Sequence, residues 1–294
     1  MTPNRIEGLV LKNYNSFYYV QDHLNNLYEC RVRGKVKTRI VTGDRVVICP
    51  LGEGKGILEG VLPRQNELTR PKIANASMVL IVFATEQPSP SMMLLDRLLF
   101  LVIYNKLQPL IVLNKSDLPG DSKAQDIISY YPRNGFNLIM TSAQKGIGID
   151  ELKAAIHNHI AVMAGPSGVG KSSLLNALYK EATAKTQEIS AKLGRGKHTT
   201  RHVELYPLDT GGWIADTPGF SVLELPNIRR EELAGYFIDF DTFSQECRFA
   251  NCLHYKEKEC GVKQAVKENK ILPERYSNYI TMLEEVIENE RCYK

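Results

Sequence analysis

A glycine-rich string near the middle of the 294-residue chain has the residue types and the spacing needed to hold phosphate groups. It follows the apolar stretch IAVMA and precedes the helical stretch SSLLNALYKE. Glycines let backbone N–H groups curl around phosphate oxygens, and the next helix adds the positive end of its dipole. In this motif Lys171 reaches the outer phosphates and acts in catalysis, while the Ser172 hydroxyl ligates Mg²⁺. The candidate phosphate contacts are Gly165, Pro166, Ser167, Gly168, Val169, Gly170, Lys171, Ser172 and Ser173.

A second string, NKSD, ends an apolar strand pattern and has the chemistry to recognise guanine. Asp117 can accept hydrogen bonds from guanine N1–H and from the exocyclic amine, while Asn114 and Lys115 shape the pocket. Adenine has no such donor pair, so the Asp117 carboxylate would lack hydrogen-bond partners if ATP were bound, which disfavours ATP. By itself the string also fits a polar strand-to-helix turn. The TSA string after the next strand places Ser142 and Ala143 for backbone contacts to the base, but carries no weight alone.

The strings DTPG and HTT could sense the terminal phosphate. Asp216 ends a strand and could bind Mg²⁺ through water, and the Gly219 N–H could reach the γ-phosphate, although the string also fits a simple turn. Thr199 or Thr200 could complete the Mg²⁺ shell; the alternative is two threonines that open a strand. We favour Thr200 as the ligand.

The position that orients the attacking water in a Ras-like switch is a glutamine two residues after the proline of the DxxG string. Here it is Phe220, whose ring cannot orient water, so intrinsic hydrolysis is expected to be slow and to need help. His198 is the candidate helper. The alternative reading is a solvent-exposed or phosphate-contacting histidine.

These strings resemble those of the translational class of GTPases in everything except their order, which implies a circular permutation. When the two chain termini of a parallel α/β domain lie close together, they can be linked and new termini opened elsewhere without disturbing the site. Because the permuted GTPase domain ends just after DTPG, the segment that contacts the γ-phosphate continues directly into the C-terminal region. We therefore expect hydrolysis to change the C-terminal region through this covalent connection, which we call the covalent lever.

The C-terminal region contains CRFANCLHYKEKEC, which places Cys247, Cys252, His254 and Cys260 in a C-x4-C-x-H-x5-C spacing. Three thiolates and one imidazole form a closed tetrahedral shell, the arrangement of a structural zinc site. The alternative is a set of buried thiols beside a core histidine.

The elements that position these strings change type along the chain. Residues 1–64 read as five short strands, an oligonucleotide-binding (OB) type barrel, with an SH3-like barrel fitting nearly as well. Residues 65–223 alternate strands with helices, a parallel α/β GTPase domain whose first helix is expected to open at Ser89-Pro90 and run to about Lys106. Residues 224–294 read as a helical zinc-binding domain.

Composition fits a globular chain with 43% hydrophobic and 24% charged residues, and no leader or membrane span is expected. Residues 1–70 hold 11 Lys and Arg against 7 Asp and Glu, although the net charge of the whole chain is only +4. Five cations alternate in one strand-like stretch and are expected to share a face that binds RNA. A solvated strand face is the alternative. The five are Arg31, Arg33, Lys35, Lys37 and Arg39.

The permuted motifs, the five-strand barrel, the Cys/His spacing, GRGKHTTR and CGVKQAV together resemble the ribosome small subunit-dependent GTPase A family, also called the YjeQ or YloQ type. The resemblance covers essentially the whole chain. It implies a GTPase that docks on the small ribosomal subunit and its rRNA, is stimulated by it, and acts late in its maturation. It also implies a catalytic role for His198. Many relatives have a third threonine where this chain has Arg201.

We therefore expect a monomeric, cytoplasmic enzyme that converts GTP to GDP with Mg²⁺ and holds one structural zinc ion. A nucleotide-regulated RNA scaffold with incidental GTPase activity and a small-molecule kinase using the same phosphate loop are the alternatives.

Overall fold

The computed structural model describes residues 5–14, 16–34, 36–69, 71–179, 203–216 and 224–292. The chain divides into two compact units. The first comprises Met1–Met78, Ile149–Met163 and Ser172–Ser221, and the second Val79–Gly148, Ala164–Lys171 and Val222–Lys294. Of the candidate site residues, five lie outside the described ranges: Lys35, His198, Thr199, Thr200 and Gly219.

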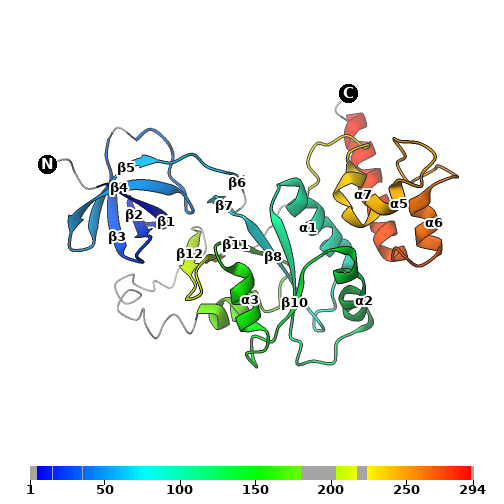
Figure 1. Cartoon of the computed structure of the whole chain (residues 1–294), viewed down its shortest axis with the longest axis horizontal. Coiled ribbons are helices and arrows are strands. Elements are labelled where there is room, and N and C mark those ends of the chain that lie inside the picture. The colour runs from blue at the N-terminus through cyan, green and yellow to red at the C-terminus, as the bar shows by residue number, and fades with distance from the viewer. Residues whose placement is uncertain are drawn as a thin grey trace. The chain divides into compact units, whose positions relative to one another are not determined.

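The N-terminal strands form a closed barrel in the order β1-β2-β3-β5-β4 (Figure 1). Strand β3 runs parallel to β5, and the other pairs are antiparallel. This non-sequential closure is a Greek-key arrangement, which confirms the OB type over the SH3-like alternative. Its core is formed by Val10, Val20, Cys30, Ile40, Val46, Ile48 and Leu58. The strands are β1 (Ile6–Tyr14), β2 (Phe17–Asp22), β3 (Leu27–Val32), β4 (Arg45–Gly52) and β5 (Lys55–Val61).

The expected face of five alternating cations does not form. Strand β3 ends at Val32, and a turn follows in which the Val36 N–H donates to the Arg33 carbonyl at 3.0 Å. A chain that turns at Gly34 cannot keep the alternation of a strand, so only Arg31 of the five lies on the strand.

A six-stranded sheet follows, in the order β10-β9-β8-β11-β13-β12. Strands β9 and β10 are parallel, as are β11 and β13, while β12 is an antiparallel edge strand. All residues of β8 and β11 are buried, as their continuous apolar runs predict. The strands are β8 (Met78–Ala84), β9 (Gln108–Asn114), β10 (Leu138–Met140), β11 (Ile160–Ala164), β12 (Glu204–Pro207) and β13 (Trp213–Asp216). A hairpin not expected from the sequence, β6 (Glu67–Thr69) and β7 (Lys72–Ala74), precedes them.

Helix α1 (Met92–Tyr104) begins two residues later than expected. Ser91, not Ser89, is the N-cap: its backbone is extended and its hydroxyl accepts the Leu94 N–H at 3.3 Å. The helix ends before Lys106, whose φ of 57° is left-handed. The other helices in this part are α2 (Ser122–Tyr130), the 3-10 helix η1 (Pro132–Asn134), α3 (Ile149–Ile156) and a helix over residues 171–179.

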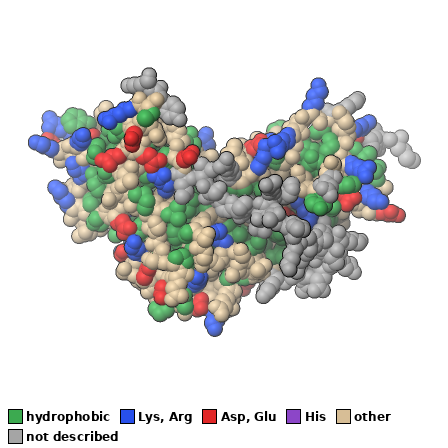
Figure 2. Space-filling model, turned by 180° about the vertical axis from the view of Figure 1, so that it is seen from behind, with side chains coloured by type: hydrophobic (Ala, Val, Ile, Leu, Met, Phe, Trp, Pro, Cys, Tyr) green, Lys and Arg blue, Asp and Glu red, His purple; other side chains and the backbone are tan. Residues whose placement is uncertain are grey.

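The C-terminal segment is helical, as expected, and its long helix α7 packs beside α1 in the second unit. Their shared apolar core includes Phe100, Phe237, Phe240, Tyr279 and Met282. On the face drawn in Figure 2, basic and acidic side chains are interspersed, in keeping with the small net charge. The elements are η2 (Leu233–Tyr236), η3 (Ile238–Phe240), α5 (Asp241–Ser244), α6 (Gly261–Lys267) and α7 (Pro273–Cys292).

Candidate functional site

The glycine-rich loop leaves the end of β11 and leads into the helix that begins at residue 171. Gly165 has a φ of 135°, and a Cβ there would lie 2.0 Å from the Val82 carbonyl oxygen, so only glycine fits. The Lys171 ammonium donates to the carbonyls of Gly165 and Pro166, at 2.8 and 2.6 Å. Partial burial lowers the pKa of Lys171. The Lys171 ammonium is thus bound by carbonyl groups of its own loop, and a phosphate group would compete with these carbonyls for it.

Asn114 fastens the base-reading string to the phosphate-holding loop. Its Nδ2 donates to the Val169 carbonyl at 2.8 Å, although the two residues are far apart in sequence. Its Oδ1 accepts the Ala143 N–H at 3.1 Å and the Thr141 hydroxyl at 3.3 Å. Asn114 is buried, so these bonds are shielded from water. Three strings that are separate in the chain therefore meet at one side chain.

Asp117 is exposed and lies beside the TSA string. A hydrogen bond from the Ser142 hydroxyl lowers the pKa of Asp117, which keeps the carboxyl group ionised. An ionised carboxylate can accept only, which suits the two adjacent donors of guanine. The Lys115 backbone is left-handed, with a φ of 61°, and its ammonium donates to the Gln87 carbonyl.

Two backbone donors of the TSA string are already engaged. The Ser142 N–H donates to the Ile147 carbonyl at 3.0 Å, and the Ala143 N–H donates to Asn114. Both N–H groups thus have partners inside the site, and the Ser142 hydroxyl bonds to Asp117. The expected backbone contacts of Ser142 and Ala143 to the base stay a prediction.

The strands that lead to the phosphate loop and to DTPG end side by side. Val162 of β11 is paired with Ala215 of β13 in parallel register, so the carboxyl ends of these two strands lie side by side. Asp216 is the last residue of β13, and Ser172 and Ser173 are exposed at the start of the helix after the loop.

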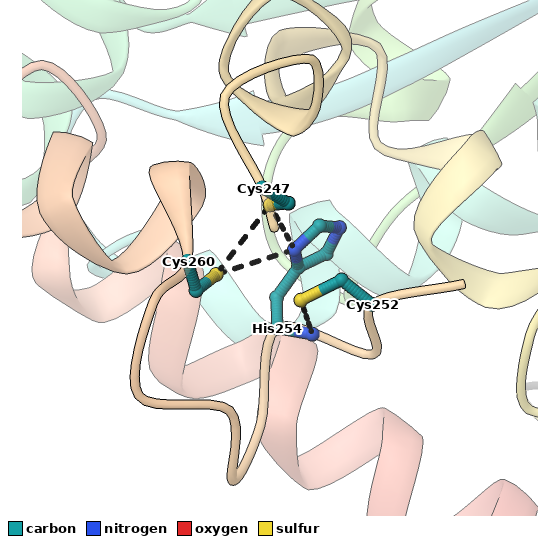
Figure 3. Close-up of side chains that lie close together, drawn as sticks. All are labelled: Cys247, Cys252, His254 and Cys260. Atoms are coloured by element: carbon teal, nitrogen blue, oxygen red, sulfur yellow. Dashed lines mark hydrogen bonds between the residues drawn. The ribbon is translucent and has the colours of Figure 1, made fainter. Parts of the chain in front are cut away.

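Four side chains in the C-terminal region form a compact group that could hold one metal ion (Figure 3). Their ligand atoms all lie within 4.8 Å of one another. The thiols of Cys247 and Cys260 are 3.8 Å apart, and they lie 3.5 and 3.4 Å from Nδ1 of His254. Burial raises the pKa of the Cys252 thiol to about 12, so without a neighbouring cation this thiol stays neutral.

The surrounding structure orients this group. The Ser244 hydroxyl lies 3.3 Å from Nε2 of His254, which leaves Nδ1 to face the thiols. Cys260 is the N-cap of α6, and its sulfur accepts the Lys263 N–H. From α7, the Tyr276 hydroxyl donates to the His254 carbonyl at 2.7 Å. Helix α7 therefore holds the metal-binding loop from one side.

Sequence reasoning missed a fully buried ion cluster in the same unit. Arg275 of α7 donates twice to Asp239 at 2.6 Å and once to Asp96 of α1 at 2.5 Å. The hydroxyls of Tyr130 and Tyr131, at the end of α2, donate to Asp239 and Asp96 respectively. A carboxylate within an otherwise apolar helix pattern, Asp96 beside Arg97, was the available signal. The cluster joins α7 to the helices that flank the NKSD strand.

Comparisons with known proteins agree with this geometry. The profile described as RsgA GTPase matches residues 61–226, and the RsgA N-terminal domain profile matches residues 7–58. The chain is 46% identical over 291 residues to the "Small ribosomal subunit biogenesis GTPase RsgA" of Moorella thermoacetica, covering 98% of this chain and 100% of that relative. It is 47% identical to the protein of the same name from Carboxydothermus hydrogenoformans, covering 97% of this chain and 99% of that one.

Two solved structures are similar over almost the whole chain. The crystal structure of YloQ, described as a circularly permuted GTPase, has a TM-score of 0.80 at 37% identity and covers 97% of this chain and 96% of that one. YjeQ from Thermotoga maritima has a TM-score of 0.78 at 35% identity, covering 97% and 99%. In the described ranges, no helix combines the length and the apolar character needed to cross a bilayer. By its motifs, their order in the chain and its full-length relatives, the chain is a circularly permuted GTPase of the RsgA family.

Proposed function

We propose that the chain hydrolyses GTP during late maturation of the small ribosomal subunit, binding the subunit and its rRNA in the GTP state and leaving after subunit-stimulated hydrolysis. The observation that supports a guanine nucleotide is the bond from Asn114 to Val169, because it joins the string that contains Asp117 to the phosphate loop. The subunit as partner rests on the names of the full-length relatives.

Each motif residue then has a role. Asp117 accepts the two guanine donors, and Lys171 leaves the loop carbonyls to bind the outer phosphates. Mg²⁺, when bound, would neutralise charge on the phosphates, held by Ser172, Thr200 and Asp216. The Gly219 N–H senses the γ-phosphate. His198 assists the attacking water, because the position after DTPG is Phe220.

The metal in the C-terminal group is proposed to be structural zinc. Zinc–sulfur bonds of about 2.3 Å in a tetrahedron place two sulfurs about 3.8 Å apart. The separation of Cys247 and Cys260 is 3.8 Å, so their spacing fits. The donor set of three thiols and one imidazole leaves no open position for substrate, which suits a folding role rather than catalysis.

We further propose that the chain is a monomeric cytoplasmic protein with three domains, 1–64, 65–223 and 224–294. The family profiles, which match residues 7–58 and 61–226, support the first boundary. The covalent lever from DTPG into the C-terminal region is part of this proposal. The lever would be abandoned if hydrogen exchange over residues 225–294 were identical with GDP and with a non-hydrolysable GTP analogue.

The decisive experiment measures GTP turnover with and without purified small ribosomal subunits. A rise in turnover on adding subunits is expected; a slow rate that ignores them would favour the RNA scaffold instead. Asp117→Asn provides the specificity test, because an amide pairs with xanthine instead of guanine. Preference should shift from GTP to xanthosine triphosphate, whereas an unchanged preference would favour a kinase that does not use this residue to read the base.

A further inference from the structure

The loop that follows β8 contacts the guanine-reading string at several points. It comprises residues 85–91, between the end of β8 and the start of α1, and we call it the β8–α1 loop. Its sequence, TEQPSPS, belongs to none of the nucleotide-binding strings described above. Thr85, its first residue, is only 2% exposed, so the hydrogen bonds that it makes are shielded from water.

Thr85 is bonded to both ends of the loop that contains NKSD (residues 114–121), which we call the NKSD loop. At the start, the Thr85 N–H donates to the Asn114 carbonyl at 2.9 Å, and the Thr85 hydroxyl donates to the Lys115 carbonyl at 2.8 Å. At the end, the Asp121 N–H donates to the Thr85 carbonyl at 3.1 Å. Asp121 is also the N-cap of α2. One residue outside the NKSD loop therefore fixes where this loop begins and where it ends.

The Lys115 carbonyl, which accepts the Thr85 hydroxyl, also begins the turn that contains Asp117. It accepts the Leu118 N–H at 2.9 Å, and this bond closes the turn. The Asp117 side chain is exposed, so its direction depends on this turn and on the bond from the Ser142 hydroxyl. Removing the Thr85 hydroxyl would therefore loosen the backbone that orients the guanine-reading carboxylate.

The β8–α1 loop also binds the Lys115 side chain, because the Lys115 ammonium donates to the Gln87 carbonyl. Gln87 has a φ of 52°, a left-handed backbone that residues other than glycine rarely adopt. The next residue, Pro88, lies beside the phosphate loop: its Cδ would be 3.7 Å from a Cβ at Gly168. The β8–α1 loop thus lies against the NKSD loop and the phosphate loop at once.

We propose that Thr85 is a positioning residue for guanine recognition: its hydroxyl holds the Lys115 carbonyl, and with it the turn that orients Asp117 toward the base. The Gln87 carbonyl positions the Lys115 side chain in the same way. A carboxylate that accepts two adjacent donors tolerates little displacement, because hydrogen bonds weaken steeply as their angles close. This inference rests on the proposed function, because it assumes that Asp117 reads guanine.

The test measures GDP affinity of the full-length chain by titration calorimetry. Thr85→Val keeps the shape of the side chain but removes the hydroxyl, and it should bind GDP about fivefold more weakly, the usual effect of one hydrogen bond. Thr85→Ser keeps the hydroxyl and should bind GDP like wild type. Thr42→Val is the matched control, because Thr42 is also buried and its hydroxyl donates to the Val203 carbonyl at 2.9 Å, between β3 and β4 of the barrel. It should bind GDP like wild type.

Inosine diphosphate separates positioning of Asp117 from a general loss of structure. Its base keeps the N1–H and lacks the exocyclic amine, so the carboxylate has one donor to accept instead of two. A displaced carboxylate loses the paired arrangement, so Thr85→Val should weaken GDP more than inosine diphosphate and narrow the preference between them. A general loss of structure would weaken both equally. Thermal melting establishes that each variant is folded.

Gln87 offers a second pair of variants at an exposed position. Gln87→Gly keeps the carbonyl, and glycine adopts a φ of 52° without strain, so GDP affinity should stay at the wild-type value. Gln87→Val disfavours this backbone and should weaken GDP binding. In Lys115→Met, which lacks the ammonium, adding Gln87→Val should cause little further loss, because the contact is already absent. Equal GDP affinity of the two Gln87 variants would remove Gln87 from the inference.

Three results would overturn the role of Thr85: GDP affinity of Thr85→Val within about twofold of Thr42→Val, equal losses for GDP and inosine diphosphate, or a Thr85→Ser variant as weak as Thr85→Val. Asp117→Asn is measured alongside. If it shifts preference to xanthosine nucleotides while Thr85→Val binds like the control, only this inference fails. If it shifts nothing, the guanine-reading role of Asp117 in the proposed function fails instead.

Discussion

Replacing Asn114 by alanine should weaken guanine nucleotide binding, because Asn114 joins three strings of the nucleotide site. The substitution removes three hydrogen bonds, at 2.8, 3.1 and 3.3 Å. The first joins the NKSD string to the phosphate loop, and the other two join it to the TSA string. Each such bond contributes about 1 kcal/mol, so about 3 kcal/mol of loop alignment is lost. If nucleotide binding must restore that alignment, affinity falls about a hundredfold, at about 1.4 kcal/mol per factor of ten.

The assay is a fluorescence titration with GDP carrying an N-methylanthraniloyl group, performed beside thermal melting of the same variants. Asn114→Asp provides the finer test, because it keeps the oxygen that accepts from Ala143 and Thr141 but replaces the donor to Val169 by a second oxygen. Two oxygens then face each other, so its affinity should be no better than that of Asn114→Ala.

Two glycines in the loop give a matched pair that tests the same contact from the other side. Gly170 and Gly168 have φ of 94° and 83°, so alanine at either costs similar backbone strain. A Cβ at Gly170 would lie 2.3 Å from Asn114 Nδ2, whereas the nearest atom to one at Gly168 is Pro88 Cδ at 3.7 Å. Gly170→Ala should therefore lose clearly more GDP affinity.

The reasoning would be refuted if Asn114→Ala bound GDP within about twofold of wild type, or if the two glycine variants were equally affected. Either result would mean that the contact from Asn114 to the phosphate loop does not align the two halves of the nucleotide site.

Three further predictions concern stability. Arg275→Met leaves two buried carboxylates without their cation and should cost about 3–5 kcal/mol in urea unfolding, whereas Arg248→Met, in an exposed ion pair, should change it by less than about 1 kcal/mol. Cys252→Ser removes one ligand of the metal group and should lower Tm and release metal to a chromophoric chelator; Cys292→Ser, at an exposed thiol outside the group, should do neither. Burial raises the pKa of Cys30 to about 12, so the folded chain keeps this proton between the ordinary thiol value of 9.0 and about 12 while the unfolded chain releases it. Stability should therefore fall as pH rises through that window, and Cys30→Val should show a shallower fall.

Local patterns predicted most of the elements because the signals are themselves local. The continuous apolar runs of β8 and β11 mark buried strands, and the glycines of the phosphate loop mark a backbone that no larger residue can adopt. The four metal-binding side chains lie within fourteen residues, so their spacing alone indicated that they meet.

Errors arose where local signals competed. Alternating cations from Arg31 onward predicted one strand, yet the chain turns at Gly34 and the pattern is lost. The pair Ser89-Pro90 predicted a helix start, yet Ser91 lies closer to the first helical residues and caps their N–H groups. Which of the two serines caps the helix depends on the backbone conformation at each position, and the spacing of apolar residues in the sequence does not specify that conformation.

The sequence alone determined which residues could bind guanine, phosphate and metal, because those requirements concern residue type and short spacing. Only the tertiary structure decided that Asn114 reaches Val169, that the Ala143 N–H is used internally, and that Arg275 is buried against Asp96 and Asp239. These partners are 55, 29, 179 and 36 residues apart. Their pairing depends on which strands and helices pack side by side, and that is settled by the burial of apolar surface across the whole fold rather than by any local stretch of chain.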